Sequence, residues 1–278
     1  MGFFENRPKE TQFGMPSLLE CNDLRESVAL CRKLGLQFVE LNMNFPQYQL
    51  EKLDANELKS LSEEYGIFYT LHFDDNMNVA DFNPYVADAY RRTVTETVEL
   101  AKKVGIPVLN MHLLSGARYT MPDRKVYFFE AYRDEYLKRI EAFRDACCEA
   151  AGDSDILICV ENTSGFHAFQ KNALDILLER PMFALTLDTG HNHCAEYQDE
   201  PWMFERKNRI CHMHLHDSKS GWRDHLGLGA GDVNIEKYLD LAEEAKCTVV
   251  LETKTLAGLG QSVDWIHNQK RYNKKDLN

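Results

Sequence analysis

Six apolar segments of this sequence each end in a side chain of a type that can bind a metal. Each segment is a short run of β-prone residues that ends in an imidazole or a carboxylate. Any one of these groups has an ordinary explanation as a hydrogen-bonded core residue or a helix cap, but six in the same position indicate a shared site. Mixed imidazole and carboxylate ligands favour Zn or Mn, with Fe, Co or Mg as further candidates, over Ca. The terminal residues are His72, His112, Glu161, Asp188, His214 and Glu252.

One of these segments carries three histidines in alternation, His212, His214 and His216. Successive side chains of a β-strand point to opposite faces, so the histidines share one face and Met213 and Leu215 share the other. A charged or polar group inside a protein is costly unless it is paired or bound to a metal. We therefore expect the histidines to face an interior in which a cation offsets the repulsion between neighbouring carboxylates.

The segments belong to a repeated unit, in which a β-rich run precedes a longer stretch of helical period. Eight units predict a parallel sheet with crossover helices, and they fit a closed (β/α)8 TIM barrel better than the alternative, an open doubly wound sheet. Such a barrel needs about 250 residues and carries its active site at the carboxyl ends of its strands. The 278 residues therefore form a single domain, 1–278. The predicted strands are Gln12–Ser17, Gln37–Asn42, Ile67–Phe73, Pro107–Leu113, Asp155–Asn162, Phe183–Asp188, Ile210–Asp217 and Thr248–Thr253.

Two of the intervening helices are marked by apolar residues at three- and four-residue steps, Tyr85–Val104 and Lys125–Ala151. Glycine follows a helix in KLGLQ, EYGIF and KVGIP, as a C-cap requires. The glycine-rich stretch 227–232 lacks the register of a dinucleotide fingerprint and the lysine of a phosphate-binding loop. We expect it to pass its backbone close to the site, with Asp232 or Asn234 capping the next helix.

The remaining histidines lack the support of a strand end. We expect His167 and His193 in loops, and His267 in a structural role in the last helix. Eight cysteines without a CxxC pair are best explained as reduced small hydrophobic residues.

Composition excludes some classes of function. No apolar run is long enough to span a membrane, and the polar N-terminus lacks a signal peptide, so we expect a cytoplasmic protein without a membrane partner. The net charge of −12 disfavours broad, non-specific nucleic-acid binding. Nothing in the sequence fixes an oligomeric state.

An ordered set of short motifs resembles the xylose isomerase-like TIM barrels, which include sugar isomerases and epimerases and the endonuclease-IV-type abasic-site nucleases (AP endonuclease family 2). The motifs are ENTSG, LDTGH, HMHLHDSKS, DHLGLGAGD and LETK, and the resemblance extends from His72 to Glu252. By this resemblance, four residues match the metal ligands of the epimerase branch, namely Glu161, Asp188, His214 and Glu252.

Further ligands of the nuclease branch, in which three zinc ions are expected, match His72, His112, His191 and His225. One departure is that Arg223 stands where the nucleases have an aspartate, with Asp224 adjacent but out of register. His112 is followed by Leu-Leu-Ser-Gly, which also differs from the nuclease pattern.

The resemblance and the ligand set favour a divalent-metal-dependent isomerase or epimerase that acts on a sugar or sugar derivative through an enediolate. Glu161 and Glu252 would form the acid/base pair on opposite sides of the substrate. Glu40 and His216 are expected to bind the substrate or support the ligands, and Trp222 to cover a sugar face or pack within its loop.

The first alternative is a zinc-dependent phosphodiesterase that cuts nucleic acid at abasic sites. The second alternative is a barrel that binds a ligand or metal without turnover.

Overall fold

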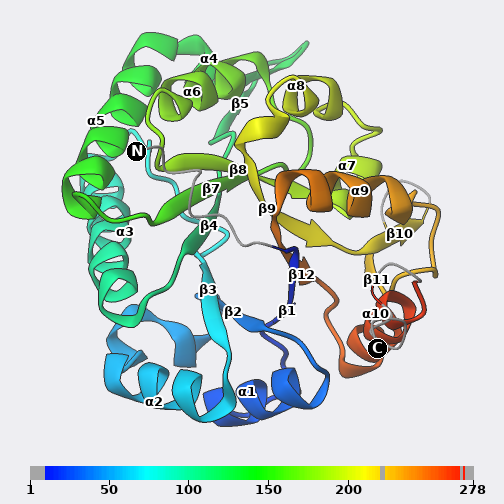
Figure 1. Cartoon of the computed structure of the whole chain (residues 1–278). Helices are drawn as coiled ribbons and strands as arrows, with labels where there is room; N and C mark the ends of the chain where they lie inside the picture. Colours follow the sequence, from blue (N-terminus) through cyan, green and yellow to red (C-terminus); the bar gives the residue numbers. More distant parts are fainter. Residues whose placement is uncertain (1–9, 220–222, 270–271, 273–278) are drawn as a thin grey trace.

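The structure, a computed structural model, describes residues 10–219, 223–269 and 272. Eight parallel strands close into a barrel in the order β1-β12-β9-β8-β7-β4-β3-β2 (Figure 1). The predicted (β/α)8 fold is confirmed, and each predicted strand is present. The barrel strands are β1 (Gln12–Pro16), β2 (Phe38–Asn42), β3 (Phe68–His72), β4 (Val108–His112), β7 (Leu157–Glu161), β8 (Phe183–Asp188), β9 (Ile210–Leu215) and β12 (Thr248–Leu251).

Side-chain alternation divides each barrel strand between two environments. Met213 and Leu215 of β9 belong to the large apolar core that joins the strands to the surrounding helices, as the sequence predicts. A second, smaller cluster holds Val108, Cys159 and Ala184 of three neighbouring strands. Because a strand repeats every two residues, the next side chains on this inner face are polar. They are Asn110, Glu161 and Thr186, all buried.

Helices alternate with the strands and cover the outside of the barrel (Figure 1). Gly66 and Gly105 cap two of them in the left-handed conformation, as EYGIF and KVGIP predict. Asn234 caps the helix that begins at Ile235. The helices are α1 (Leu24–Lys33), α2 (Ala55–Tyr65), α3 (Pro84–Val104), α4 (Phe128–Ala131), α5 (Arg133–Ala151), α6 (Ala168–Leu178), α7 (Thr189–Cys194), α8 (Glu200–Phe204), α9 (Ile235–Ala245) and α10 (Leu256–His267), with 3-10 turns at Pro46–Tyr48, Leu50–Lys52 and Lys207–Arg209.

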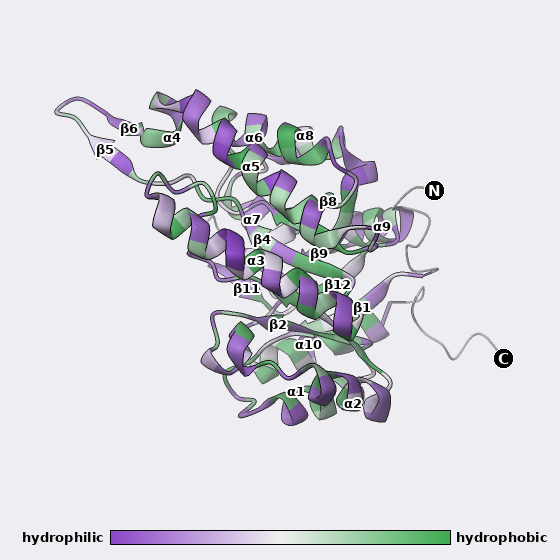
Figure 2. Cartoon of the chain, turned by 90° about the vertical axis from the view of Figure 1, so that its left-hand side faces the viewer, coloured by the Kyte–Doolittle hydropathy of each residue, from purple (hydrophilic) through white to green (hydrophobic). Residues whose placement is uncertain are grey.

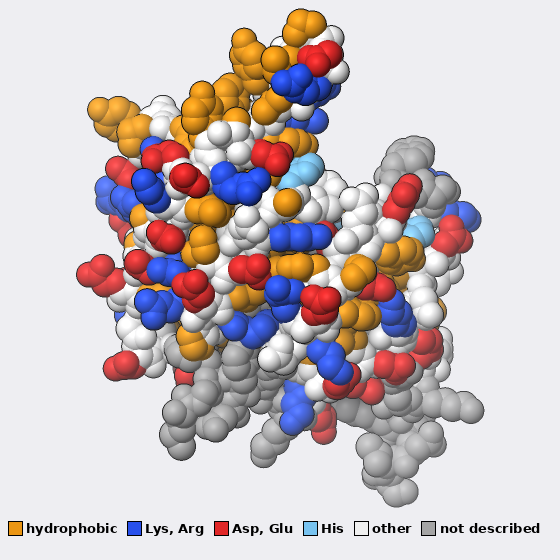
Figure 3. All heavy atoms as spheres, turned by 90° about the horizontal axis from the view of Figure 1, so that it is seen from above, with side chains coloured by type: hydrophobic (Ala, Val, Ile, Leu, Met, Phe, Trp, Pro, Cys, Tyr) orange, Lys and Arg blue, Asp and Glu red, His pale blue; other side chains and the backbone are white. Residues whose placement is uncertain are grey.

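The predicted helix Lys125–Ala151 is wrong at its start. Residues Lys125–Tyr127 form β6, which pairs antiparallel with β5 (Arg118–Thr120) in a hairpin that projects from the barrel (Figure 2). The helical part is interrupted at Tyr132, whose backbone is not helical and whose side chain is 59% exposed. In Figure 3, hydrophobic side chains gather on this projecting part, where Tyr119 is also exposed.

The predicted seventh strand is also divided. β9 ends at Leu215, and Asp217 begins β10 (Asp217–Lys219), which pairs antiparallel with β11 (Arg223–Leu226). This second hairpin follows the barrel strand and brings His225 back over it.

All eight cysteines lie in the described part of the chain, where none forms a disulfide and six are buried, in agreement with the prediction. Among the described residues, no helix combines the length and the apolar character that crossing a membrane requires.

Candidate metal centre

Four side chains from separate strand ends meet inside the barrel. Glu161, Asp188, His214 and Glu252 each offer a ligand atom, and these atoms lie within 4.8 Å of one another. All four residues are buried, with Glu252 the most exposed at 6%. The carboxyl ends of parallel strands lie at the same rim of the barrel. This explains how Glu161 and Glu252, about ninety positions apart in the sequence, come together.

The innermost atoms of this group lack ordinary partners. His214 Nδ1 and Glu252 Oε2 are buried and have no hydrogen bond within the described chain. They lie 3.2 Å apart, and Glu161 Oε2 is also 3.2 Å from His214 Nδ1. Buried polar atoms are almost always satisfied, and carboxylates with an imidazole form a normal ligand set for a first-row divalent metal. The donor set therefore fits a divalent cation.

Glu40 lies behind His214. Its Oε1 lies at ion-pair distance from His214 Nε2, 2.9 Å, without the geometry of a hydrogen bond, while its Oε2 accepts hydrogen bonds from Thr70 and His212. A carboxylate on the far nitrogen of a histidine fixes the ring and directs the near nitrogen to the metal. Of the two roles expected for Glu40, the geometry favours support of His214, because both carboxylate oxygens are occupied.

His216 supports a second ligand in the same way. Its Nδ1 accepts the backbone N–H of His225, so its Nε2 carries the proton and lies 3.0 Å from Asp188. The ring packs so closely against Gly190 that a Cβ there would lie 2.0 Å from it. The LDTGH motif thus needs glycine at position 190 to admit His216.

A second group of possible ligands surrounds Glu161. His72 Nε2 and His112 Nε2 lie 3.3 Å and 3.5 Å from Glu161 Oε2. On their other side, Nδ1 of each ring is 3.8 Å from Asp75. Glu161 thus connects the central group with both histidines, and sequence reasoning missed Asp75 because it lies in the loop after β3.

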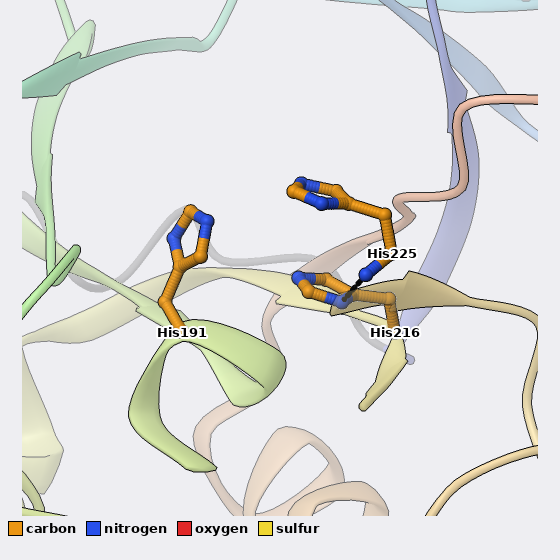
Figure 4. Close-up of side chains that lie close together, drawn as sticks. All are labelled: His191, His216 and His225. Carbon is orange, nitrogen blue, oxygen red and sulfur yellow. Dashed lines mark hydrogen bonds between the residues drawn. The ribbon is translucent and has the colours of Figure 1, made fainter. Parts of the chain in front are cut away.

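A third group contains His191, His216 and His225 (Figure 4). The rings of His216 and His225 stack in parallel with centroids 4.3 Å apart, and His191 from α7 meets both edge-on. Asp224 bonds to His225 Nδ1 at 2.9 Å and lies 3.9 Å from His191 Nε2.

Asp224 is out of register in the sequence motif, yet its carboxylate lies against the rings of both His225 and His191. The left-handed backbone of His225, with φ of 54°, lets the adjacent aspartate reach both rings, while Arg223 is exposed.

Protons on the histidines balance the carboxylates when no metal is bound. Burial lowers the pKa of His72, but the charge and hydrogen bond of Glu161 raise it to about 9. For His191, Asp188 and Glu161 likewise outweigh burial and raise the pKa to about 10. Burial raises the pKa of Glu161, yet His214 and His112 hold it well below its usual range.

The stability of the metal-free protein should therefore fall at alkaline pH. Histidine has a pKa near 6.5 in an unfolded chain, so the raised pKa values of His72 and His191 stabilise the fold fully below that pH. This contribution is lost as pH rises through about 9 and 10. Urea denaturation of chelator-treated protein at several pH values measures it, and a free energy of unfolding that stays flat or rises from pH 7 to pH 10 contradicts the assignment.

Asn110 is a further contact of Glu161 that sequence reasoning missed. Its Nδ2 donates to Glu161 Oε2 at 2.5 Å, and Thr186 donates to its Oδ1. The signal was available, because Asn110 precedes His112 by two residues and shares its strand face.

The glycine-rich loop is held by Asp217 rather than by the ligands themselves. This buried carboxylate accepts four backbone N–H groups, from Ser218, Gly229, Gly231 and Val233, at 2.8–3.0 Å. A Cβ at Gly231 would lie 2.3 Å from Asp217 Oδ1. Outside the loop itself, its backbone N–H groups donate to Asp217, Ser218 and Ser262 of α10, and a close approach to the ligands stays a prediction.

Asp217→Ala should destabilise the protein, because four buried or partly buried N–H groups lose their acceptor. Hydrogen bonds to a charged group contribute about 1.5–3 kcal/mol each, so a loss of at least about 3 kcal/mol is expected by urea denaturation. Asp232→Ala, an exposed change in the same loop, is the control and should change stability by less than about 0.5 kcal/mol. Equal stability of the two variants contradicts the anchoring role.

Three histidines lie outside the clustered groups. His167 precedes α6, and His267 ends α10, as expected. His193 lies in α7 instead of a loop, because the side chain of Asp188 caps that short helix through the N–H of His191. Trp222 lies outside the described residues.

Comparisons with known proteins agree with this fold. A family model described as xylose isomerase-like TIM barrel matches residues 28–269. A D-tagatose 3-epimerase-like protein of known structure has a TM-score of 0.78 and 20% identity, covering 95% of this chain and 99% of its own. D-allulose 3-epimerase from Methylomonas sp. has a TM-score of 0.69 and 16% identity, covering 94% and 98%. The IolI protein, solved with a zinc atom, has a TM-score of 0.70 and 14% identity, covering 95% and 97%.

Proposed function

Because the chain belongs to the xylose isomerase-like TIM barrel family, we propose that it is a divalent-metal-dependent isomerase or epimerase of a sugar or sugar derivative. One observation carries the proposal. Glu161 and Glu252 approach His214 Nδ1 from different strands, each with one oxygen at 3.2 Å. Zinc or manganese suits this donor set, and the similar IolI protein was solved with zinc.

The two glutamates are arranged to move a proton between the faces of a substrate. Glu161 Oε1 points to His191 at 3.3 Å and Glu252 Oε1 to Lys254 at 2.7 Å, so each carboxylate keeps one oxygen outside the central group. A bound divalent cation would polarise the carbonyl of the substrate and stabilise the negative charge of an enediolate. One glutamate removes the proton next to the carbonyl, and the other returns a proton to the carbon.

The loops after β3 and β4 leave room for a polyhydroxylated molecule. An open pocket of about 350 Å³ lies between them, with polar lining from Asn76, Asn78 and Ser115. Asn76 follows Asp75, which faces His72 and His112. The amide and hydroxyl groups of this pocket suit the hydroxyl groups of a sugar.

Solvent exchange tests the proposed function. Wild-type protein loaded with Zn or Mn is incubated with a panel of ketoses in deuterium oxide, and deuterium next to the carbonyl is measured by NMR. Incorporation that a chelator abolishes supports the proposal. Absence of exchange across ketopentoses, ketohexoses and keto-glycosides with protein of verified metal content contradicts it.

The histidine groups favour one second candidate, a phosphodiesterase that cuts nucleic acid at abasic sites. His72 and His112 flank Glu161, while His191 and His225 share the carboxylate of Asp224. Several adjacent metal ions can activate water and stabilise a leaving oxygen. Chelator-sensitive nicking of an abasic-site duplex at nanomolar protein, without deuterium incorporation into any ketose, would establish this candidate in place of the first.

A further inference from the structure

Lys254 is a cation placed directly at the ligand group. Its Nζ lies 2.7 Å from Glu252 Oε1, and its side chain is 53% exposed. In the ranges 10–219 and 223–269, the other ion pairs of Glu40, Glu161, Asp188 and Glu252 are all with histidines. Within these ranges, Lys254 is therefore the one lysine or arginine that forms an ion pair with these four carboxylates.

The position of Lys254 differs from that of a simple structural counter-ion. The inner oxygen of Glu252, Oε2, faces His214 and His225 at 3.2 Å and 3.6 Å. Lys254 contacts the outer oxygen instead, and its half-exposed chain reaches solvent. The pair joins a half-exposed ammonium to a buried carboxylate, so solvent screens part of its contribution to stability.

The charge balance of the site gives a stronger reason for a lysine at position 254. Three buried carboxylates, Glu161, Asp188 and Glu252, line the centre, and Glu40 lies behind His214. Before any histidine protons are counted, these are two more negative charges than one divalent cation carries. An enediolate adds further negative charge to the same place. A lysine is charged at neutral pH, and a fixed cation near developing charge is worth most in a site of low dielectric.

We propose that Lys254 is a further catalytic residue, whose ammonium group donates a hydrogen bond to the substrate oxygen that becomes negative when Glu252 exchanges a proton with the substrate. This inference rests on the proposed function. As the C–H bond breaks, its proton passes to the Glu252 carboxylate and its electron pair forms the carbon–carbon double bond. The carbonyl π electrons move to oxygen, and Lys254 binds that oxygen without giving up its proton. The return of a proton to carbon reverses these changes.

Binding of a charged mimic tests Lys254 without turnover. Glycolohydroxamate, which loses a proton and binds a metal as a planar anion that resembles an enediolate, and xylitol, a neutral polyol, are titrated into Zn-loaded protein by calorimetry. For Lys254→Gln we expect hydroxamate affinity to fall at least about tenfold with little change for xylitol, because a fixed charge favours the anion. Lys254→Arg should recover part of the loss. Lys219→Gln, at an exposed lysine after the neighbouring strand β9, is the matched control and should bind as wild type does.

Each outcome decides the role of Lys254. Weaker hydroxamate binding in Lys254→Gln, with normal metal content, circular dichroism and xylitol affinity, supports it. Unchanged hydroxamate affinity overturns it, as does an equal loss for both probes or a wild-type protein that does not bind the anion. The deuterium exchange of the wild type separately decides the proposed function. Exchange by the wild type together with unchanged hydroxamate binding by the variant rejects Lys254 alone.

Discussion

Glu161→Gln and Glu252→Gln should each lower kcat for solvent exchange by roughly 10²–10⁴-fold, the usual contribution of a positioned acid or base. Glutamine keeps the shape of the side chain but cannot take up a proton at neutral pH. Both glutamates are buried and hold one oxygen 3.2 Å from His214 Nδ1, so the loss should appear in kcat more than in KM. The rate of deuterium incorporation, followed by NMR, measures it.

The control for this pair is Glu149→Gln, an exposed change on α5 that should leave the rate unchanged. Circular dichroism and metal analysis of each variant separate a lost proton transfer from a lost fold or a lost ion. Near-normal exchange in either site variant would remove that glutamate from the acid/base pair.

Removal of the metal should lower the midpoint of thermal unfolding by about 10 °C. A ligand present at about 1,000 times its Kd stabilises the folded state by about 4 kcal/mol, and 1 kcal/mol corresponds to about 2–4 °C for a large domain. The physical reason is that the folded protein alone brings together the ligand atoms of Glu161, Asp188, His214 and Glu252, within 4.8 Å of one another, so the binding free energy of a cation there stabilises the fold. Differential scanning calorimetry of chelated and Zn-loaded protein measures the shift.

His214→Ala provides the comparison for this shift, because it removes the imidazole at the centre of the group. Its melting midpoint should respond to Zn much less than that of the wild type. A wild-type midpoint that is the same with and without metal, at verified loading, is incompatible with a buried cation at this position.

Periodicity and fold predict that six strand-end residues meet at one rim, and the family resemblance selects the four of the central group among them. Alternation on β9 puts His214 on the inner face, and the carboxyl ends of parallel strands share one rim. Glu161, Asp188 and Glu252 each close a β-rich run. Their convergence therefore follows from the order of elements alone, without any knowledge of the loops.

The loops could not be predicted in the same way. Asp217 was placed at a strand end, but its contacts with Gly229 and Gly231 depend on how a loop folds back across twelve to fourteen residues. Asp75 and Asp224 reach the histidines through loop and hairpin geometry that has no sequence period. The predicted start of the helix Lys125–Ala151 was wrong for a related reason. Lys125–Tyr127 form a three-residue strand, and so short a segment has too little alternation to outweigh the helical period of the residues that follow.

Anomalous diffraction from crystals of metal-loaded protein, recorded at the absorption edge of the metal, tests the central claim most directly. The account predicts a peak about 2.0–2.2 Å from His214 Nδ1, with carboxylate oxygens of Glu161, Asp188 and Glu252 around it and Glu40 on the far side of the imidazole. A fully loaded crystal whose peaks all lie away from these four residues would contradict it.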